Sequence, residues 1–92
     1  MALIEWSAPA LQDLQAAGDF VAKENPDAAG RMAARVREAA EYLSEHPNIG
    51  RPGRLAETRE LVVSGSAIII VYWLREGRIQ ILRMLHHARR WP

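Results

Sequence analysis

The sequence predicts an α+β fold in which a helical hairpin packs on an antiparallel sheet, and two observations carry this prediction. Residues 58–92 hold three apolar, β-branched runs separated by the short turns Gly65-Ser66 and Glu76-Gly77, a pattern typical of an antiparallel meander. The first half holds two stretches with apolar residues at helical spacing, each behind a helix start signal. With one short strand at the start, the element order is β-α-α-β-β-β.

Residues 2–6 are mostly apolar, with Glu5 interrupting them, and predict that first strand. Ser7 is a favoured N-cap and Pro9 is tolerated in a first turn, so we expect the first helix to run from there to about Lys23. Its apolar stripe is expected to contain Leu11, Leu14, Ala17 and Val21, with Phe20 beside it.

A second helix is expected from about Pro26 to His46. Asn25 supplies its cap, and Asp27 favours the positive end of the helix dipole. The turn between the helices is short, so they form an antiparallel hairpin, and Pro47 stops the second helix. The apolar face of this helix is expected to contain Met32, Val36, Ala39, Ala40 and Leu43.

Residues 47–57, PNIGRPGRLAE, form the one long loop, because two Gly and two Pro break regular structure. Arg51 and Arg54 are presented on it. Two interpretations stay open: these arginines contact a partner, or they only keep the loop in solvent and favour the end of the preceding helix.

The run Ile68–Val71 is continuous rather than alternating, which predicts a central strand buried on both faces. Arg59 and Arg83 lie among alternating apolar neighbours, so each needs a partner or an edge. Glu5 and Glu60 are the candidate partners, and a structural ion pair and a ligand contact are both open. Leu61 and Val63 are expected to share the face of Arg59, and Ile79, Ile81 and Leu85 that of Arg83.

Length and composition favour a single domain over residues 1–92 that belongs in the cytoplasm. There is no cysteine, no basic and apolar leader, and no apolar run of the ~20 residues that span a bilayer. Charge is uneven: residues 1–46 carry four basic and eight acidic side chains, and residues 47–92 carry eight and three. The second half therefore suits an acidic partner.

No pattern of residues indicates a metal or a cofactor. His86 and His87 are adjacent, so on a strand they point to opposite faces, and no phosphate-binding glycine loop or nucleophile motif is present. RNA strand cleavage stays open, because it needs only a base, an acid and a cation. Arg59, Arg83, His86 and Tyr72 supply those residue types.

The helical hairpin and the later segments together resemble the RelE/ParE superfamily of toxins from bacterial type II toxin–antitoxin systems, and its ParE branch most closely. The similarity covers essentially the whole chain. The motifs that carry it are Gly50-Arg51-Pro52-Gly53-Arg54, Thr58-Arg59-Glu60-Leu61, Val71-Tyr72 and Leu85-His86-x-Ala88-Arg89-x-Trp91-Pro92. The resemblance implies a cognate antitoxin, with an acidic and partly disordered segment, and growth arrest once the toxin is released.

Two activities occur in that superfamily. ParE-like members poison DNA gyrase by binding, whereas RelE-like members are ribosome-dependent mRNA endonucleases. The nucleases carry a catalytic Arg two residues before the Val-Tyr pair, where this chain has Ile69. The resemblance therefore favours the gyrase inhibitor, with no catalytic residue; the nuclease, with direct nucleic-acid binding, is the alternative. The residues expected to contact the target are Arg51, Arg54, His86, His87, Arg89, Arg90 and Trp91.

Overall fold

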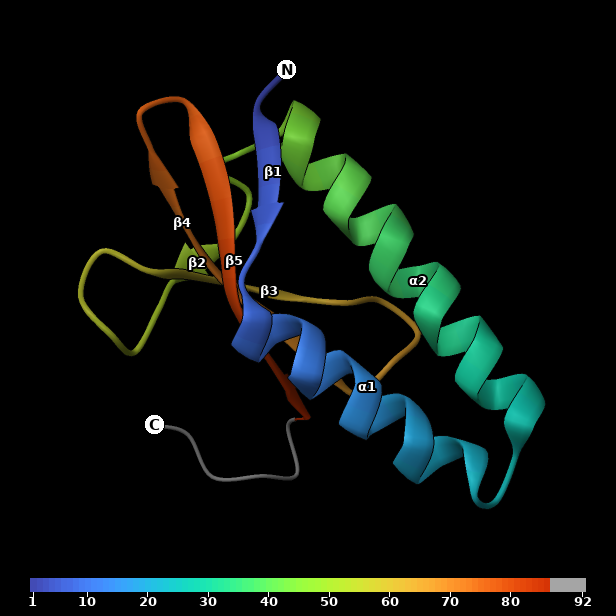
Figure 1. Cartoon of the computed structure of the whole chain (residues 1–92). Coiled ribbons are helices and arrows are strands. Elements are labelled where there is room, and N and C mark those ends of the chain that lie inside the picture. Colours follow the sequence, from blue (N-terminus) through green and yellow to red (C-terminus); the bar gives the residue numbers. More distant parts are fainter. Residues whose placement is uncertain (87–92) are drawn as a thin grey trace.

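The fold has two layers, a five-stranded sheet and a pair of helices that covers one of its faces (Figure 1). This computed structural model describes residues 1–86. The predicted α+β class and the predicted order of the main elements are confirmed. The elements are β1 (Leu3–Trp6), α1 (Ala8–Ala22), α2 (Pro26–Glu45), β2 (Arg51–Pro52), β3 (Arg59–Val62), β4 (Ile68–Arg75) and β5 (Arg78–His86).

The sheet is mixed, in strand order β1-β5-β4-β3-β2. β3, β4 and β5 form the predicted antiparallel meander, and the two-residue turn Glu76-Gly77 has positive φ at both positions, as a type I′ hairpin requires. Two features differ from the prediction. β1 pairs with β5 in parallel, an arrangement that needs a long connection, and α1 to β4 lie between these two strands in the sequence. The loop contains the short strand β2.

Both helix starts match the prediction. The side chain of Ser7 accepts a hydrogen bond from Ala10 N at 3.1 Å, and that of Asn25 accepts one from Ala28 N at 3.1 Å. The predicted face of α2 packs against the sheet, but Leu11 of α1 is 52% exposed. Leu11 was wrongly placed because it lies one position off the stripe that packs on the sheet, which consists of Ala10, Leu14, Ala17 and Val21.

β4 is the central strand, as predicted, and its first five residues are buried. Ile68, Ile70 and Tyr72 belong to the core between the sheet and the helices. Ile69 and Val71 lie on the opposite face, which we call the outer face, where they cluster with Leu85. The strand is therefore covered on both sides.

A β-bulge in β5 separates Arg83 from Ile79 and Ile81, with which it was predicted to share a face, whereas Leu85 shares its face as predicted. Val71 pairs with Arg83 and the next residue, Tyr72, pairs with Ile81, so Leu82 has no partner in register. The inserted residue reverses the alternation, and Arg83 lies on the outer face instead of the face of Ile81. Ile79 lies with Ile81 in the core facing the helices.

The start of α1 closes the part of β5 that β1 leaves unpaired. Beyond Trp6, Ser7 N donates to Ile81 O at 3.0 Å and Ser7 Oγ donates to Leu82 O at 2.8 Å. Asp13 then accepts hydrogen bonds from Met84 N at 3.0 Å and from Arg83 Nε at 2.6 Å. The partner of Arg83 is therefore Asp13, not Glu5 or Glu60 as expected. Among residues 1–86, no helix is long and apolar enough to cross a membrane.

Replacing Asp13 with Asn should destabilise the protein by about 1–2 kcal/mol. The charge-assisted bond to the half-exposed Arg83 is lost, whereas the amide oxygen of Asn can still accept from Met84 N. The expected fall in melting temperature is roughly 5–10 °C, measured by circular dichroism. Asp19→Asn is the matched control, because the side chain of Asp19 is also on α1 and accepts a hydrogen bond from the exposed side chain of Gln15. Equal melting temperatures for the two variants would contradict the assigned role of Asp13.

Candidate functional site

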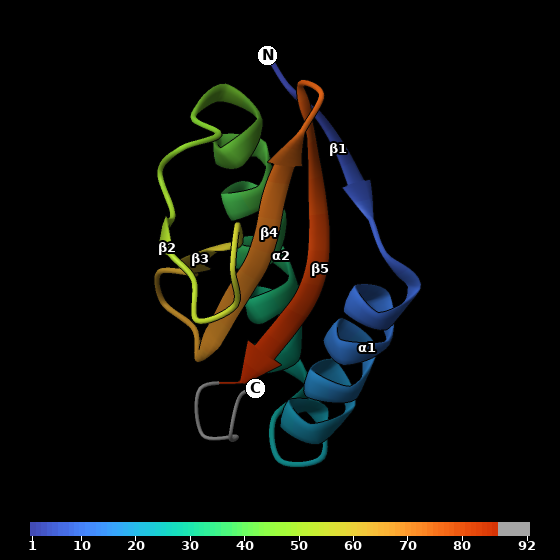
Figure 2. The ribbon, with the colours of Figure 1, turned by 90° about the vertical axis from the view of Figure 1, so that its left-hand side faces the viewer.

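The arginine loop, residues 47–57, runs from the end of α2 to the edge of the sheet beside β3 (Figure 2). Its two-residue strand β2 pairs with β3, with Arg51 opposite Glu60 and Pro52 opposite Arg59. Figure 2 shows the outer face of the sheet, with this loop at its margin, α2 behind the sheet and α1 beside β5. The loop predicted to carry Arg51 and Arg54 is thus a shaped extension of the sheet.

Two side chains from the sheet hold the start of the loop. The hydroxyl of Tyr72 donates to Pro47 O at 2.8 Å and accepts from Gly50 N at 2.9 Å. Arg59 Nη1 donates to Gly50 O at 2.8 Å and to Asn48 O at 3.2 Å. A Cβ on Gly50 would lie 2.7 Å from the hydroxyl of Tyr72, so this close approach requires glycine.

A buried carboxylate holds the rest of the loop. Glu60, which is 3% exposed, accepts hydrogen bonds from Arg54 through the backbone N at 3.0 Å, Nε at 3.2 Å and Nη2 at 3.1 Å. Arg51 Nη2 lies 3.5 Å from the same carboxylate. Both arginines belong to the loop, so one glutamate fixes two guanidinium groups.

These contacts set the ionisation of Glu60. The bonds from Arg54 lower the pKa of its carboxyl below the ordinary value, more than burial raises it, and Arg51 acts in the same direction. Because the folded-state pKa is the lower one, these ion pairs contribute stability at pH values above the ordinary carboxyl pKa. That contribution is lost as the pH falls through the lowered value.

The loop leaves part of each arginine open to solvent, since the side chain of Arg51 is 63% exposed and that of Arg54 is 43% exposed. Two large apolar residues of the same loop, Ile49 and Leu55, are also exposed. Neither apolar residue was predicted to belong to the site, and Glu60 was predicted only as an ion-pair partner, not as the residue that holds the loop arginines. The alternation of Glu60 with apolar strand residues was the available signal.

His86 lies away from the loop, at the end of β5. Its ring packs edge-on against Phe20 of α1, with 6.3 Å between centroids, and Phe20 is 67% exposed. The other four residues expected to contact the target, His87, Arg89, Arg90 and Trp91, lie outside the described residues. The structure therefore brings Arg51 and Arg54 together but does not bring His86 to them.

The four candidate nuclease residues are spread over the sheet. Tyr72 is fully buried, and burial raises the pKa of its phenol despite the nearby Arg59 and the bond from Gly50. Arg59 lies beside Tyr72, but its guanidinium is bound to loop carbonyls. Both side chains thus serve the loop.

The other two candidates lie elsewhere. Arg83 is on the outer face, where Asp13 raises the pKa of its guanidinium. His86 pairs with Ile68, four residues along β4 from Tyr72, which is about 13 Å away along the strand. Arg83, His86 and Tyr72 therefore do not converge on one substrate atom.

Ile69 occupies the position where the resemblance places the catalytic arginine of nucleases. Its side chain lies on the outer face in an apolar cluster with Val71 and Leu85. No cation stands at that position. Within residues 1–86, no three side chains of His, Asp or Glu gather as a metal-binding group.

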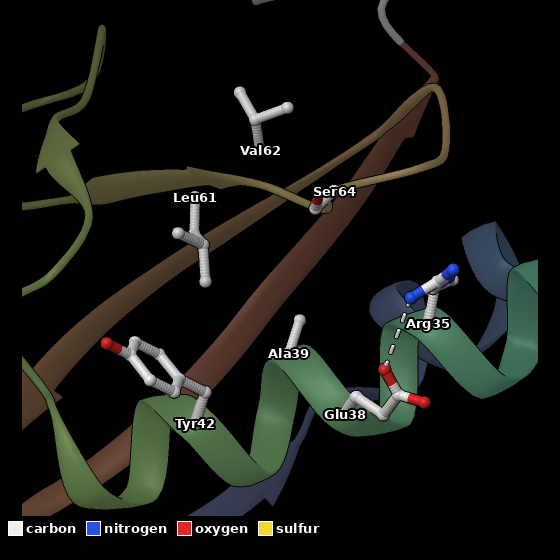
Figure 3. Close-up of a pocket in the computed structure, with 7 residues that line it drawn as sticks. All are labelled: Arg35, Glu38, Ala39, Tyr42, Leu61, Val62 and Ser64. Atoms are coloured by element: carbon white, nitrogen blue, oxygen red, sulfur yellow. Dashed lines mark ion pairs between the residues drawn. The ribbon is translucent and has the colours of Figure 1, made fainter.

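A groove of about 270 Å³ lies between α2 and β3 (Figure 3). Leu61 points across it toward Tyr42 and Ala39, and the ion pair between Arg35 and Glu38, 3.7 Å apart, lies at one end. The residues that line it are Arg35, Glu38, Ala39, Tyr42, Leu61, Val62 and Ser64. Its lining is mainly apolar and holds none of the predicted site residues.

The chain is similar to known toxins over nearly its full length. The profile of the family described as ParE toxin of type II toxin–antitoxin system, parDE, matches residues 4–91. Y4kP of Sinorhizobium fredii, which carries a provisional toxin name, is 40% identical over 97% of this chain and 92% of its own. Toxin RelE2 of Caulobacter vibrioides is 42% identical over 97% of this chain and 99% of its own.

Among solved structures, a chain of the chromosomal ParDE TA system from P. aeruginosa superposes with a TM-score of 0.81. It is 25% identical, and the match covers 94% of this chain and 96% of that one. The family profile, the relatives and the shared fold agree with the motifs found in the sequence. The chain belongs to the ParE toxin family of type II toxin–antitoxin systems.

Proposed function

We propose that this ParE-family toxin, once free of its antitoxin, arrests growth by binding DNA gyrase without cleaving a substrate. One observation carries the choice. The candidate nuclease residues do not converge, and the position that a nuclease would fill with arginine holds Ile69 in an apolar cluster. Residues that cannot meet at one phosphate favour a protein that acts by binding.

The proposed contact residues come from the arginine loop and from the C-terminal segment. Arg51 and Arg54 offer the solvent-exposed parts of guanidinium groups that Glu60 holds, and Trp91 offers a large apolar anchor. The remaining proposed contacts are His86, His87, Arg89 and Arg90. Aromatic and arginine side chains of this kind dominate the energetics of protein interfaces.

The proposed partner that restrains the toxin is an antitoxin with an acidic, partly disordered segment. The solved relative comes from a ParDE TA system, which supports such a partner. Exposed apolar side chains on both layers, among them Leu11, Phe20 and Val62, support it as well, because a segment that folds on binding can cover a large surface.

The second candidate function is ribosome-dependent mRNA cleavage. The 42% identity to a protein named Toxin RelE2 favours it. Under this alternative Arg83, His86, Tyr72 and Arg59 would have to rearrange before they could act on one phosphate. We therefore rank it second.

Purified toxin added to a gyrase supercoiling reaction should inhibit supercoiling, and the same toxin added to translating ribosomes should leave a mapped mRNA intact. The physical reason is that a binding surface is preformed, whereas a catalytic group of residues is not. Toxin mixed beforehand with its antitoxin is the control and should inhibit neither reaction. Cleaved message with undisturbed supercoiling would establish the nuclease instead.

Deleting residues 88–92 should abolish gyrase inhibition while the melting temperature stays within a few degrees of the full chain. The proposed role of this segment is a contact with the target, so its removal should cost binding and not folding. The point variant Trp91→Ala should weaken gyrase binding roughly 30-fold, as expected for an interface residue worth about 2 kcal/mol. A large loss of thermal stability with binding retained would instead assign this segment a role in folding.

A further inference from the structure

We infer that Glu60 is a positioning residue: its buried carboxylate holds Arg51 and Arg54 in the array that the target meets. This inference rests on the proposed function, because it assigns the arginine loop to the contact with gyrase. It adds a residue that would never touch the target. Glu60 contacts two loop arginines, other residues hold the course of the loop, and the strand position of Glu60 is one where an apolar residue would fit.

The contacts of Glu60 all lead to the loop. Its side chain, which is 2% exposed, receives three hydrogen bonds from Arg54 and the guanidinium of Arg51 at 3.5 Å. Arg51 lies on β2 directly opposite Glu60, and Arg54 follows the turn after β2. The carboxylate thus joins the two arginines on one side of the loop, while 63% of the Arg51 side chain and 43% of the Arg54 side chain stay open.

The loop does not depend on Glu60 for its overall course. Tyr72 and Arg59 hold its start through Pro47, Asn48 and Gly50, as described above. Its far end is closed by a bond from Gly53 N to Thr58 O at 2.8 Å and by one from Thr58 Oγ1 to Leu55 O at 2.7 Å. Removing the carboxylate should therefore loosen two arginine side chains and free one backbone N–H, that of Arg54, while these other bonds preserve the course of the loop.

The position of Glu60 would suit an apolar residue. Val71, its neighbour in register on β4, is fully buried. Burying a carboxylate costs desolvation free energy, and apolar residues that replace a buried ion pair often leave stability unchanged or raise it. An apolar residue here could therefore give a similar fold stability, whereas ordering two arginines requires the carboxylate.

Ordered arginines favour binding, because a side chain that is already immobile loses little conformational entropy when the target arrives. Charge alone predicts the opposite result. Removing one negative charge makes the loop more basic, which should strengthen binding to an acidic target. The sign of the change in affinity therefore separates a positioning role from a purely electrostatic one.

The experiment compares the wild type with Glu60→Met, which keeps the approximate size and removes the acceptor. Glu60→Gln keeps one acceptor and serves as a milder second variant. Glu5→Gln is the matched control, because Glu5 is a strand carboxylate that contacts Arg78 and Gln80, away from the loop. Three quantities are measured on each full chain: the melting temperature, the affinity for gyrase, and the heteronuclear NOE of the Arg54 Nε–Hε group.

Glu60→Met should keep a melting temperature within a few degrees of the wild type and bind gyrase about tenfold more weakly. The Arg54 Nε–Hε group should become more mobile than in the wild type, because Nε loses its bond to Glu60. Glu60→Gln should change the same quantities in the same direction by less, and Glu5→Gln should leave all three unchanged. In a background that carries Arg54→Ala, the added change Glu60→Met should weaken binding by less than tenfold, since Glu60 can then act only through Arg51.

Gyrase affinity that is unchanged or tighter in Glu60→Met would overturn the inference, and so would an Arg54 NOE equal to that of the wild type. Failure of the proposed function has a different signature. If wild-type toxin does not inhibit gyrase, the target is wrong. In that case the NOE comparison decides, on its own, whether Glu60 positions the arginine.

Discussion

β4 is buried on both faces, and most of the chain is arranged to satisfy that constraint. On one face, α1 and α2 cover Ile68, Ile70 and Tyr72. On the outer face, Ile69 and Val71 pack with Leu85. Apolar burial of this extent, worth roughly 1.5–3 kcal/mol for each large side chain, exceeds what helix propensity or surface ion pairs contribute. The strand thus determines where every other element can lie.

The arginine loop begins next to Tyr72, at the end of the buried part of β4. Tyr72 fills the core, and its hydroxyl reaches Pro47 and Gly50, so the same residue supports the fold and the loop. Burial raises the pKa of this phenol, which keeps its proton in the bond to Pro47 O. Tyr72 is thus an anchor for the loop.

Most of the positive charge in the second half of the sequence is compensated by ion pairs. Two of the partners, Glu5 and Asp13, come from the acidic first half. Five arginines of residues 47–86 form ion pairs: Arg51 and Arg54 with Glu60, Arg75 with Glu57, Arg78 with Glu5, and Arg83 with Asp13. Counting charges along the chain therefore overstated the field that a partner would meet. The proposed contact with gyrase therefore relies on guanidinium groups held in place more than on long-range attraction.

Local signals predicted the local structure. Ser7 and Asn25 cap the helices as their residue types indicate, and the continuous run before Tyr72 marks the central strand. The misplaced residues depend on distant partners. One inserted residue, Leu82, reversed the face of Arg83, and the side chain that meets Arg83 comes from Asp13, 70 positions away. The alternation of residues within one strand predicts neither the bulge at Leu82 nor the contact with Asp13.

The role of Glu60 was missed for a related reason. Its residue type suggested an ion pair, but the choice of partner depends on the path of the loop, and Arg59 turned out to bind backbone carbonyls instead. The sequence could indicate which residues belong to the loop. Only the fold shows which of them a buried carboxylate holds together.

The central claim is that a buried, ionised carboxylate, that of Glu60, holds Arg51 and Arg54 of the arginine loop in place. The most direct test is a carbon-detected NMR titration of the Glu60 carboxyl in the wild-type protein. The account predicts a pKa below the ordinary glutamate value, because the bonds from Arg54 and the charge of Arg51 outweigh the effect of burial. A pKa at or above the ordinary value would mean that the carboxylate is buried without these partners, and it would contradict the account.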